Sequence, residues 1–238
     1  MITKFSTRKP LLKSKATKNV VKKAFSGYTI NIRSRHPSHN ILRRGLPKMP
    51  FRSLVRLGST TELNDGIRRV ELNSVEAIKN SSSKLRMKQC FSQAGVKTAE
   101  WIAGNEQQVK SWCRDKFPII AKGIFGSRGE ANTKIDTAQQ LDQFLRGKNL
   151  SGYIFEAFFD GSREYRFHIS TNGVFLTWRK LRRNDTPDNE RWFFNNHNCN
   201  WVSEQHELYN RPVSYNQIAQ ECVKALNAVG LDLGKHIC

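Results

Sequence analysis

The stretch FPIIAKGIFGSRGEANT, residues 117–133, contains the residue types that bind a phosphate group. An apolar run ends in Lys122 and passes directly into a loop whose glycines recur at three-residue intervals. Glycines let the backbone come close to a ligand, and successive backbone N–H groups can form a concave anion site. The loop residues assigned to this role are Ser127, Arg128 and Gly129. The pattern predicts a phosphate cradle, although a glycine-rich turn beside a lysine is also common in purely structural hairpins.

A second stretch, YIFEAFFDGSREYRFHI at residues 153–169, places two carboxylates in apolar surroundings. Glu156 lies inside an apolar run, where a carboxylate without a partner is costly, so we expect another group to bind it. Further on, Glu164, Arg166 and His168 alternate with apolar residues and therefore share one face of a strand. That face is either a solvated row on an amphipathic strand or, together with the upstream loop, the lining of a cleft.

The elements that position these residues follow from apolar periodicity and turn chemistry. The serines at 81–83 predict a capped helix that Gly95 ends, and Thr137 predicts the cap of another. Asn-Gly at 172–173 between two β-rich runs is a hairpin signal. The full set of expected elements is a strand at 53–57, helices at 74–78, 84–94, 106–115, 137–145 and 215–229, strands at 119–122, 133–135, 153–159, 164–170 and 174–181, and a polar loop at 183–200. This order predicts an α+β fold with small lobes around a cleft.

Charge is spread unevenly along the chain of 238 residues, whose formal net charge is +20. Fifteen lysines and arginines lie between Lys4 and Arg56, and no acidic residue precedes Glu62. We interpret residues 1–50 as a basic arm or irregular wrap rather than as an organelle transit peptide, because its first part contains more lysine than arginine. An alternative function follows from this arm, namely that the chain is a nucleic-acid-binding or assembly protein with an acidic partner.

The cysteines indicate the compartment. There are five, an odd number, and no CxxC pair occurs. This favours reduced thiols in a cytosol-like compartment over a disulfide framework or a zinc site, so we expect a cytoplasmic protein. No apolar run approaches the roughly 20 residues that span a bilayer, so no membrane partner is expected.

Six pieces of the sequence, in order, resemble the ATP-grasp superfamily of carboxylate–amine and carboxylate–thiol ligases. They are NSSSKLRMKQCFSQAGVKTAEW, PIIAK with its glycine loop, YIFEAFF, GSREYRFHI, RWFFNN and ALNAVGLDLG. The resemblance covers about residues 73–234. The segments RLGSTT and NSSSKLRMK are also similar to ATP-grasp proteins encoded by bacteriophages. If this chain is encoded by a bacteriophage, its compartment is the host cytoplasm.

The resemblance implies an α+β, ATP-grasp-like fold with two lobes whose antiparallel sheets enclose a nucleotide cleft, preceded by the basic arm. It divides the chain into the arm at 1–50, a helix-rich segment at 51–115, a small lobe with the phosphate loop at 116–159, and a large lobe at 160–238. It implies ATP as the ligand and, if the protein is active, an ATP-dependent ligase.

By position, the resemblance also assigns nucleotide contacts. Lys84 and Lys122 would contact the α- and β-phosphates, and residues 127–129 would cover them. Glu156 would accept a hydrogen bond from the adenine amino group, and Glu164 would bind the ribose hydroxyls. The backbone groups expected to read the adenine edge are those of Phe158 and Phe159.

The implied reaction has two steps. ATP phosphorylates an unknown carboxylate, and an amine or thiol then displaces phosphate from the acyl-phosphate. Arg166 and Arg179 would point toward the transferred phosphate. Phosphoryl transfer needs mainly positioning and charge neutralisation, which lysines and arginines supply, so no side-chain nucleophile is required.

The match departs from the family at the metal site. The family places its Mg²⁺ ligands after the piece that ends in GLD, whereas this sequence reads GLDLGKHIC to its last residue, and Asp232 belongs to the earlier piece. We expect Mg²⁺ to accompany ATP, but the usual ligands are not identified. Three explanations stay open: a shortened product, nucleotide binding without catalysis, or recruitment of other ligands. On this basis we expect weak ATP binding and low turnover. The substitute ligands considered are Asp185, Asp188, Asn195 and Asn196.

Overall fold

The computed structural model describes residues 29–33, 53–58, 60, 62, 70–126, 131–161, 164–194, 198–203 and 213–237. These residues form two compact units, one of residues 1–82 with 229–233 and the other of residues 83–228 with 234–238. Most of the predicted basic arm and the loop residues Ser127, Arg128 and Gly129 lie outside the described residues, as do Asn195 and Asn196.

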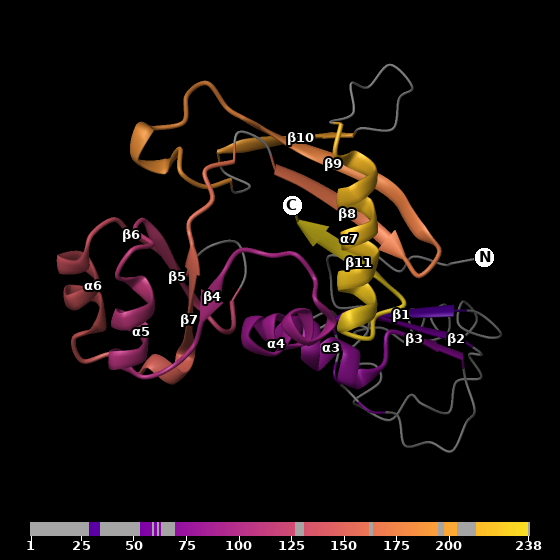
Figure 1. Ribbon diagram of the computed structural model, residues 1–238. Coiled ribbons are helices and arrows are strands. Elements are labelled where there is room, and N and C mark those ends of the chain that lie inside the picture. Colours follow the sequence, from indigo (N-terminus) through magenta and orange to yellow (C-terminus); the bar gives the residue numbers. More distant parts are fainter. Residues whose placement is uncertain are drawn as a thin grey trace, which may run out of the picture. The chain divides into compact units, whose positions relative to one another are not determined.

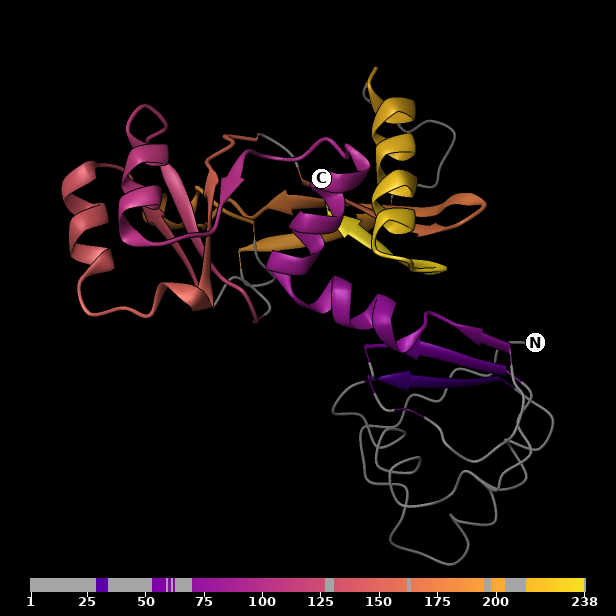
Figure 2. The ribbon, with the colours of Figure 1, turned by 60° about the horizontal axis from the view of Figure 1, so that its bottom comes forward.

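The first unit contains a parallel three-stranded sheet in the order β1-β2-β3 (Figure 2). Its strands are β1 (Thr29–Arg33), β2 (Ser53–Leu57) and β3 (Val70–Leu72), and α3 (Val75–Ser82) follows. The strand predicted at 53–57 is confirmed. Ser74 caps α3 by accepting a hydrogen bond from the Ala77 N–H at 3.1 Å.

Asn73 holds this unit together through every polar group of its side chain. Its Nδ2 donates to Arg56 O and Leu233 O, both at 2.9 Å, and its Oδ1 accepts from the N–H groups of Asp232 and Leu233 at 2.9 and 3.0 Å. Its own N–H donates to Asp232 Oδ2 at 2.6 Å. The residue has φ of +64°, a conformation that asparagine tolerates better than other non-glycine residues. The Asp232 carboxylate is therefore part of a structural hydrogen-bond network.

The second unit begins with helix α4 (Lys84–Ala94). Ser83 is its N-cap and accepts a hydrogen bond from the Arg86 N–H, and Gly95 ends it with φ of +64°. Both ends agree with the prediction. The helix buries Lys88 and Phe91, which are three residues apart and therefore lie on the same side of the helix.

The first four-stranded sheet of this unit is antiparallel and has the order β4-β7-β5-β6 (Figure 1). Its strands are β4 (Trp101–Ile102), β5 (Ile119–Gly123), β6 (Asn132–Ile135) and β7 (Tyr153–Ala157). Helices α5 (Glu106–Cys113) and α6 (Ala138–Leu145) lie side by side against one face, and a 3₁₀ turn at Leu150–Gly152 leads into β7.

Side-chain alternation gives this first sheet two different faces. Ile119, Ala121 and Phe155 pack with Val109 and Leu141 of the two helices, and all are buried. By the period of two, Lys122 and Glu156 point from the opposite face. Thr137 caps α6 as predicted, since its side chain accepts a hydrogen bond from the Gln140 N–H. The helices thus cover one face of the sheet, and the other face carries Lys122 and Glu156 among buried apolar residues.

The second four-stranded sheet has the order β10-β9-β8-β11. Its strands are β8 (Glu164–Ser170), β9 (Gly173–Arg182), β10 (Cys199–Ser203) and β11 (Leu233–Ile237), and a 3₁₀ turn lies at Asp188–Glu190. Helix α7 (Tyr215–Ala228) packs on one face, where the Tyr215 ring lies 5.4 Å from Phe167 and its hydroxyl 2.8 Å from Thr177 Oγ1.

Two strands of the second sheet differ from the sequence expectation. The polar loop predicted at 183–200 ends earlier, because Cys199 begins β10 and pairs with Arg182 of β9. Strand β11 was not predicted at all, since five residues next to a glycine-ended helix give too short a pattern to identify. Among the described residues, no helix is both long and apolar enough to cross a membrane.

Candidate functional site

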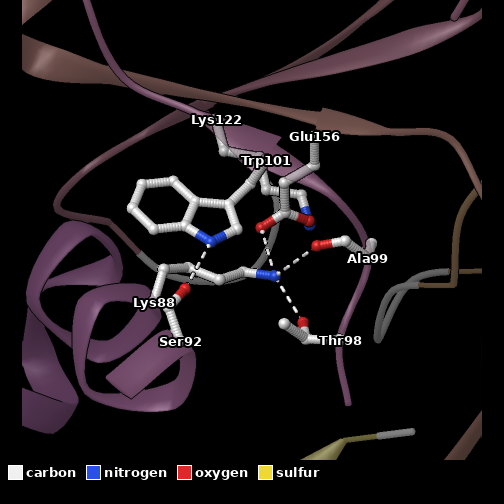
Figure 3. A network of polar contacts seen from close by, with 7 residues as sticks. All are labelled: Lys88, Ser92, Thr98, Ala99, Trp101, Lys122 and Glu156. Atoms are coloured by element: carbon white, nitrogen blue, oxygen red, sulfur yellow. Dashed lines mark hydrogen bonds and ion pairs between the residues drawn. The ribbon is translucent and has the colours of Figure 1, made fainter. Parts of the chain in front are cut away.

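Glu156 of β7 is the centre of a polar cluster on the face of the first sheet opposite α5 and α6 (Figure 3). Glu156 is only 6% exposed to solvent. One carboxylate oxygen lies 2.5 Å from Lys122 Nζ and the other 3.2 Å from Lys88 Nζ. The predicted partner of the buried carboxylate is therefore a pair of ammonium groups from different elements, β5 and α4. Both charges offset the desolvation that burial imposes on Glu156.

Lys88 was not selected from the sequence. It is 4% exposed, and its ammonium group also donates to Thr98 Oγ1 at 2.5 Å and to Ala99 O at 3.4 Å. Burial lowers the pKa of Lys88, and the neighbouring Glu156 opposes that shift. The available signal was its place three residues before Phe91, inside the apolar stripe of α4, where a lysine needs an anionic or carbonyl partner.

Lys84 is bonded to the glycine-rich loop. Its Nζ donates to the backbone carbonyls of Gly123 at 2.8 Å and Gly126 at 3.2 Å, both in the glycine-rich loop. Burial lowers the pKa of Lys84; nearby Lys122 lowers it further and Glu156 raises it. Lys84 therefore lies close to the charges of the cluster, but its hydrogen bonds go to the loop backbone.

We call Lys84, Lys88, Lys122 and Glu156 the Glu156 cluster. It contains three ammonium groups and one carboxylate, so its positive charge exceeds its negative charge. Excess like charge in partly buried surroundings is unfavourable unless an anion is bound. The excess positive charge of the cluster can therefore attract an anionic ligand to this face of the first sheet.

Phe158 and Phe159, which follow β7, differ in whether their backbone N–H groups are free to bind a ligand. The Phe158 N–H donates to Pro118 O at 3.2 Å, and the Phe159 carbonyl accepts from the Gly161 N–H at 3.1 Å. The Phe159 side chain is 82% exposed. The Phe158 N–H is thus already used inside the protein, whereas the Phe159 N–H makes no hydrogen bond to another described residue. Any backbone donor offered to a ligand here is that of Phe159.

A second polar pair lies on the second sheet. Glu164 of β8 and Lys180 of β9 are directly opposite in the register, and their charged atoms are 2.6 Å apart. Lys180 Nζ also donates to Phe194 O at 3.0 Å. Arg166 and His168 share this face with Glu164, as alternation predicted, and burial lowers the pKa of Arg166 against the opposing effect of Glu164. We call Glu164 and Lys180 the Glu164 pair.

Arg166 and Arg179 lie on neighbouring strands of the second sheet. Arg166 pairs in register with Trp178, whereas Arg179 pairs with Tyr165 on the other face of the sheet. Neighbouring strand residues alternate between faces, so the two arginines project from opposite faces of the sheet, and their assignment to the transferred phosphate stays a prediction. Arg166 lies on the same face as the Glu164 pair, and Arg179 lies on the opposite face.

The structure thus brings some predicted residues together and separates others. Lys122, Glu156 and the α4 lysines form one cluster, while Glu164 and Arg166 belong to the second sheet. Glu156 is bonded by lysines of α4 and β5, and Glu164 is bonded by Lys180 of β9. A hollow of about 690 Å³ lies elsewhere, on α5 beside Lys110, and so does not coincide with the polar cluster.

The two described substitute metal ligands, Asp185 and Asp188, are each paired with an arginine. Asp185 accepts two hydrogen bonds from Arg183, and Asp188 lies 2.9 Å from Arg191. In the part of the chain that the structure describes, no three His, Cys, Asp or Glu side chains gather as a metal site. Mg²⁺ prefers a set of carboxylate and carbonyl oxygens with water. The described residues do not fit an Mg²⁺ site.

Sequence comparison and structural comparison give different results for this chain. No protein-family model and no curated protein sequence matches it. Solved structures do match. An L-amino acid ligase from Bacillus licheniformis aligns with a TM-score of 0.58 and 15% identity over 92% of this chain and 58% of its own.

Two further structures agree. N5-carboxyaminoimidazole synthetase from Staphylococcus aureus, complexed with ADP, aligns with a TM-score of 0.58 and 13% identity over 89% of this chain and 66% of its own. The ATP-grasp ligase PsnB, complexed with minimal precursor, Mg and ADP, aligns with a TM-score of 0.50 and 19% identity over 71% of this chain and 48% of its own. The chain therefore spans about half the length of PsnB. At these identities the likeness concerns the fold, and it confirms the predicted α+β, ATP-grasp-like architecture.

Proposed function

We propose that this chain of ATP-grasp fold binds ATP and transfers its γ-phosphoryl group to a carboxylate, giving an acyl-phosphate that an amine or thiol attacks. The observation that carries the proposal is the Glu156 cluster, in which two lysines bind one carboxylate and a third lies close to its charge. The phosphates of a nucleotide would neutralise the excess positive charge of the lysines, and its adenine amino group would donate a hydrogen bond to Glu156. Two of the solved structures of the same fold contain ADP, which supports this choice of ligand.

The cluster suggests a distribution of contacts for the nucleotide. Lys122 is the phosphate-side cation, since it directly precedes the glycine-rich loop, whereas Lys88 holds the Glu156 carboxylate in place. A carboxylate has about four lone-pair sites, so Glu156 retains acceptor capacity for the adenine amino group beside a lysine. The Phe159 N–H is the available backbone donor for the adenine edge.

The second sheet would supply the remaining contacts. Glu164 would accept from the ribose hydroxyls, and Arg166 on the same face would approach the transferred phosphate. In the first step a carboxylate oxygen of the substrate attacks the γ-phosphorus, and the bond to the bridging oxygen of ADP breaks. In the second step an amine or thiol attacks the acyl carbon and inorganic phosphate leaves. Mg²⁺ would neutralise phosphate charge in such chemistry, but no step here is assigned to it.

Nucleotide binding is tested by calorimetric titration of the full chain with Mg–ATP. Lys122→Gln and Lys88→Met each remove one charged donor, so each should weaken binding by about tenfold to a hundredfold. The matched control is Lys116→Gln, which removes an exposed lysine paired with Glu100 and should leave the affinity unchanged. Equal affinity of the wild type and Lys122→Gln, both folded by circular dichroism, would overturn the site assignment.

The ligase chemistry is tested separately with hydroxylamine, an amine that traps acyl-phosphates as hydroxamates. The protein is incubated with Mg–ATP, hydroxylamine and pooled amino acids or peptides as carboxylate donors. Formation of ADP together with a hydroxamate supports the reaction, and both should fall in Arg166→Gln. Tight ATP binding with neither product from any carboxylate pool would leave nucleotide binding in place and contradict the ligase step.

A further inference from the structure

Lys84 makes three contacts with the glycine-rich loop, more than its place on a helix requires. Its backbone N–H donates to Ile124 O at 3.0 Å, and its side-chain Nζ donates to Gly123 O at 2.8 Å and Gly126 O at 3.2 Å. An ammonium group has three donor hydrogens, so two of them bind the loop. One residue of α4 therefore bonds three of the four residues from 123 to 126.

The position of Lys84 in its helix is unfavourable for a cation. It is the first residue of α4, directly after the N-cap Ser83, and helix N-termini favour negative charge. Burial also lowers its pKa, which shows that the surroundings disfavour its charged form. A lysine at this place needs compensating acceptors, and the carbonyls of Gly123 and Gly126 supply them.

The loop in turn depends on these contacts for its conformation. Gly126 has φ of +130°, which side chains rarely adopt, and a Cβ on Gly123 would lie 3.0 Å from the Cβ of Ala131. Two backbone bonds fix the loop entrance from the sheet side, Gly123 N–H to Ala131 O at 3.1 Å and Ile124 N–H to Gly152 O at 2.8 Å. At Gly126, Lys84 is the described residue that holds the carbonyl.

Helix α4 also connects the loop to the Glu156 carboxylate. Lys84 and Lys88 are four residues apart, so they project from the same side of the helix on successive turns. The first binds loop carbonyls and the second binds Glu156, 3.2 Å away. One short helix therefore contacts both the loop and the Glu156 carboxylate.

We propose that Lys84 is a positioning residue that holds the entrance of the glycine-rich loop against α4, instead of a direct phosphate ligand. This rests on the proposed function, in which the loop lies beside the phosphates of ATP. Held by Lys84, the loop entrance at residues 123–126 stays against the same helix that binds Glu156 through Lys88. Loss of the side chain should therefore impair turnover more than nucleotide affinity.

The test begins with the full chain without nucleotide, by amide hydrogen exchange and mass spectrometry. In Lys84→Met, peptides covering residues 119–126 should exchange about tenfold faster than in the wild type, because two charge-assisted hydrogen bonds are lost. Lys97→Met is the matched control, since Lys97 is an exposed lysine beyond the end of α4, and it should leave these peptides unchanged. Lys84→Arg should restore much of the protection, because its guanidinium group can also bridge two carbonyls.

Titration with Mg–ATP separates the two assignments of Lys84. If Lys84 is a positioning residue, Lys84→Met should change the Kd for ATP less than threefold while kcat falls about tenfold or more. Lys84→Arg should recover much of the lost kcat. Unchanged exchange at 119–126 together with a Kd loss as large as that of Lys122→Gln would make Lys84 a phosphate ligand and overturn the inference. If Lys84→Met does not fold, Lys84→Gln, which keeps amide donors, must show partial loop protection or the inference fails.

The two proposals also fail in different ways. The exchange experiment contains no nucleotide, so a faster-exchanging loop in Lys84→Met supports the contact even if the wild type binds no ATP. In that case the proposed function fails while the loop contact stands. Conversely, ATP binding that requires Lys88 and Lys122, without a change in loop exchange, preserves the proposed function and removes the positioning role.

Discussion

The carboxylates of Glu156 and Glu164 lie in neighbouring stretches of the sequence, but they are surrounded in different ways. Glu156 binds Lys122, 34 residues earlier on β5, and Lys88 on α4. Glu164 binds Lys180, the residue directly opposite in its own β-hairpin. The Glu156 side chain is 8% exposed and that of Glu164 is 18% exposed. One site is assembled from three separate elements, and the other is a consequence of strand register.

The two carboxylates therefore differ in how many cations surround them and in what their removal would leave behind. In the Glu156 cluster three lysines exceed one carboxylate, whereas Glu164 faces Lys180, which is further bonded to Phe194 O, and Arg166. Removing Glu156 would leave two ammonium groups in a buried place. Removing Glu164 leaves one lysine that keeps a carbonyl acceptor.

The largest expected effect tests this contrast directly. Glu156→Gln should lower the free energy of unfolding by about 3–5 kcal/mol, because a buried ion pair that loses one member leaves an uncompensated charge at Lys88. Urea unfolding followed by circular dichroism measures the change. A loss below about 1 kcal/mol would show that the lysines relax into solvent and that the cluster is not buried as described. Glu100→Gln, which removes the exposed partner of Lys116, is the control.

The same substitution on the second sheet should have a smaller effect. Glu164→Gln is expected to lower the free energy of unfolding by about 1–3 kcal/mol, since the amide still accepts a hydrogen bond and Lys180 keeps Phe194 O. A double-mutant cycle with Lys180→Met isolates the pair. If Glu164→Gln is as destabilising as Glu156→Gln, the contrast between packing and register is wrong.

The pH dependence of stability sharpens the comparison further. Burial lowers the pKa of both Lys84 and Lys88 below the ordinary value of 10.5. Between the lowered pKa and 10.5 the unfolded chain binds more protons than the folded chain, so these lysines make stability rise as pH increases through that window. The double variant Lys84→Met with Lys88→Met should lose this rise, as measured by urea unfolding at stepped pH. A rise equal to that of the wild type would place the effect elsewhere.

The smallest expected effect concerns cysteine reactivity. Cys113 is fully buried among the helices of the first sheet, and burial raises its pKa to about 11, so its thiol should resist alkylation in the folded chain. Cys90 on α4 is partly exposed and should react first. Glu156→Gln should accelerate labelling of Cys113, read by peptide mass spectrometry, whereas Glu164→Gln should not. Equal acceleration by both variants would mean that the two sheets open together.

The local features of the fold were accessible from the sequence because they depend on neighbours in the chain. The Asn-Gly turn at 172–173 and strict alternation predicted the hairpin of β8 and β9 and the shared face of Glu164, Arg166 and His168. Caps at Ser83 and Thr137 were also correct, since each bonds a backbone N–H three residues away. Strands β10 and β11 were missed because they are short and paired with residues distant in sequence.

The sequence by itself determined that Glu156 is buried and needs a partner, that a lysine precedes a glycine-rich loop, and which side chains of β8 share a face. Only the tertiary structure decided that Lys88 is a partner of Glu156, that Lys84 binds the loop backbone, and that Arg179 turns away from Arg166. The reason is physical. Periodicity specifies the direction of a side chain within its own element, but its partner depends on how helices and strands pack across dozens of intervening residues.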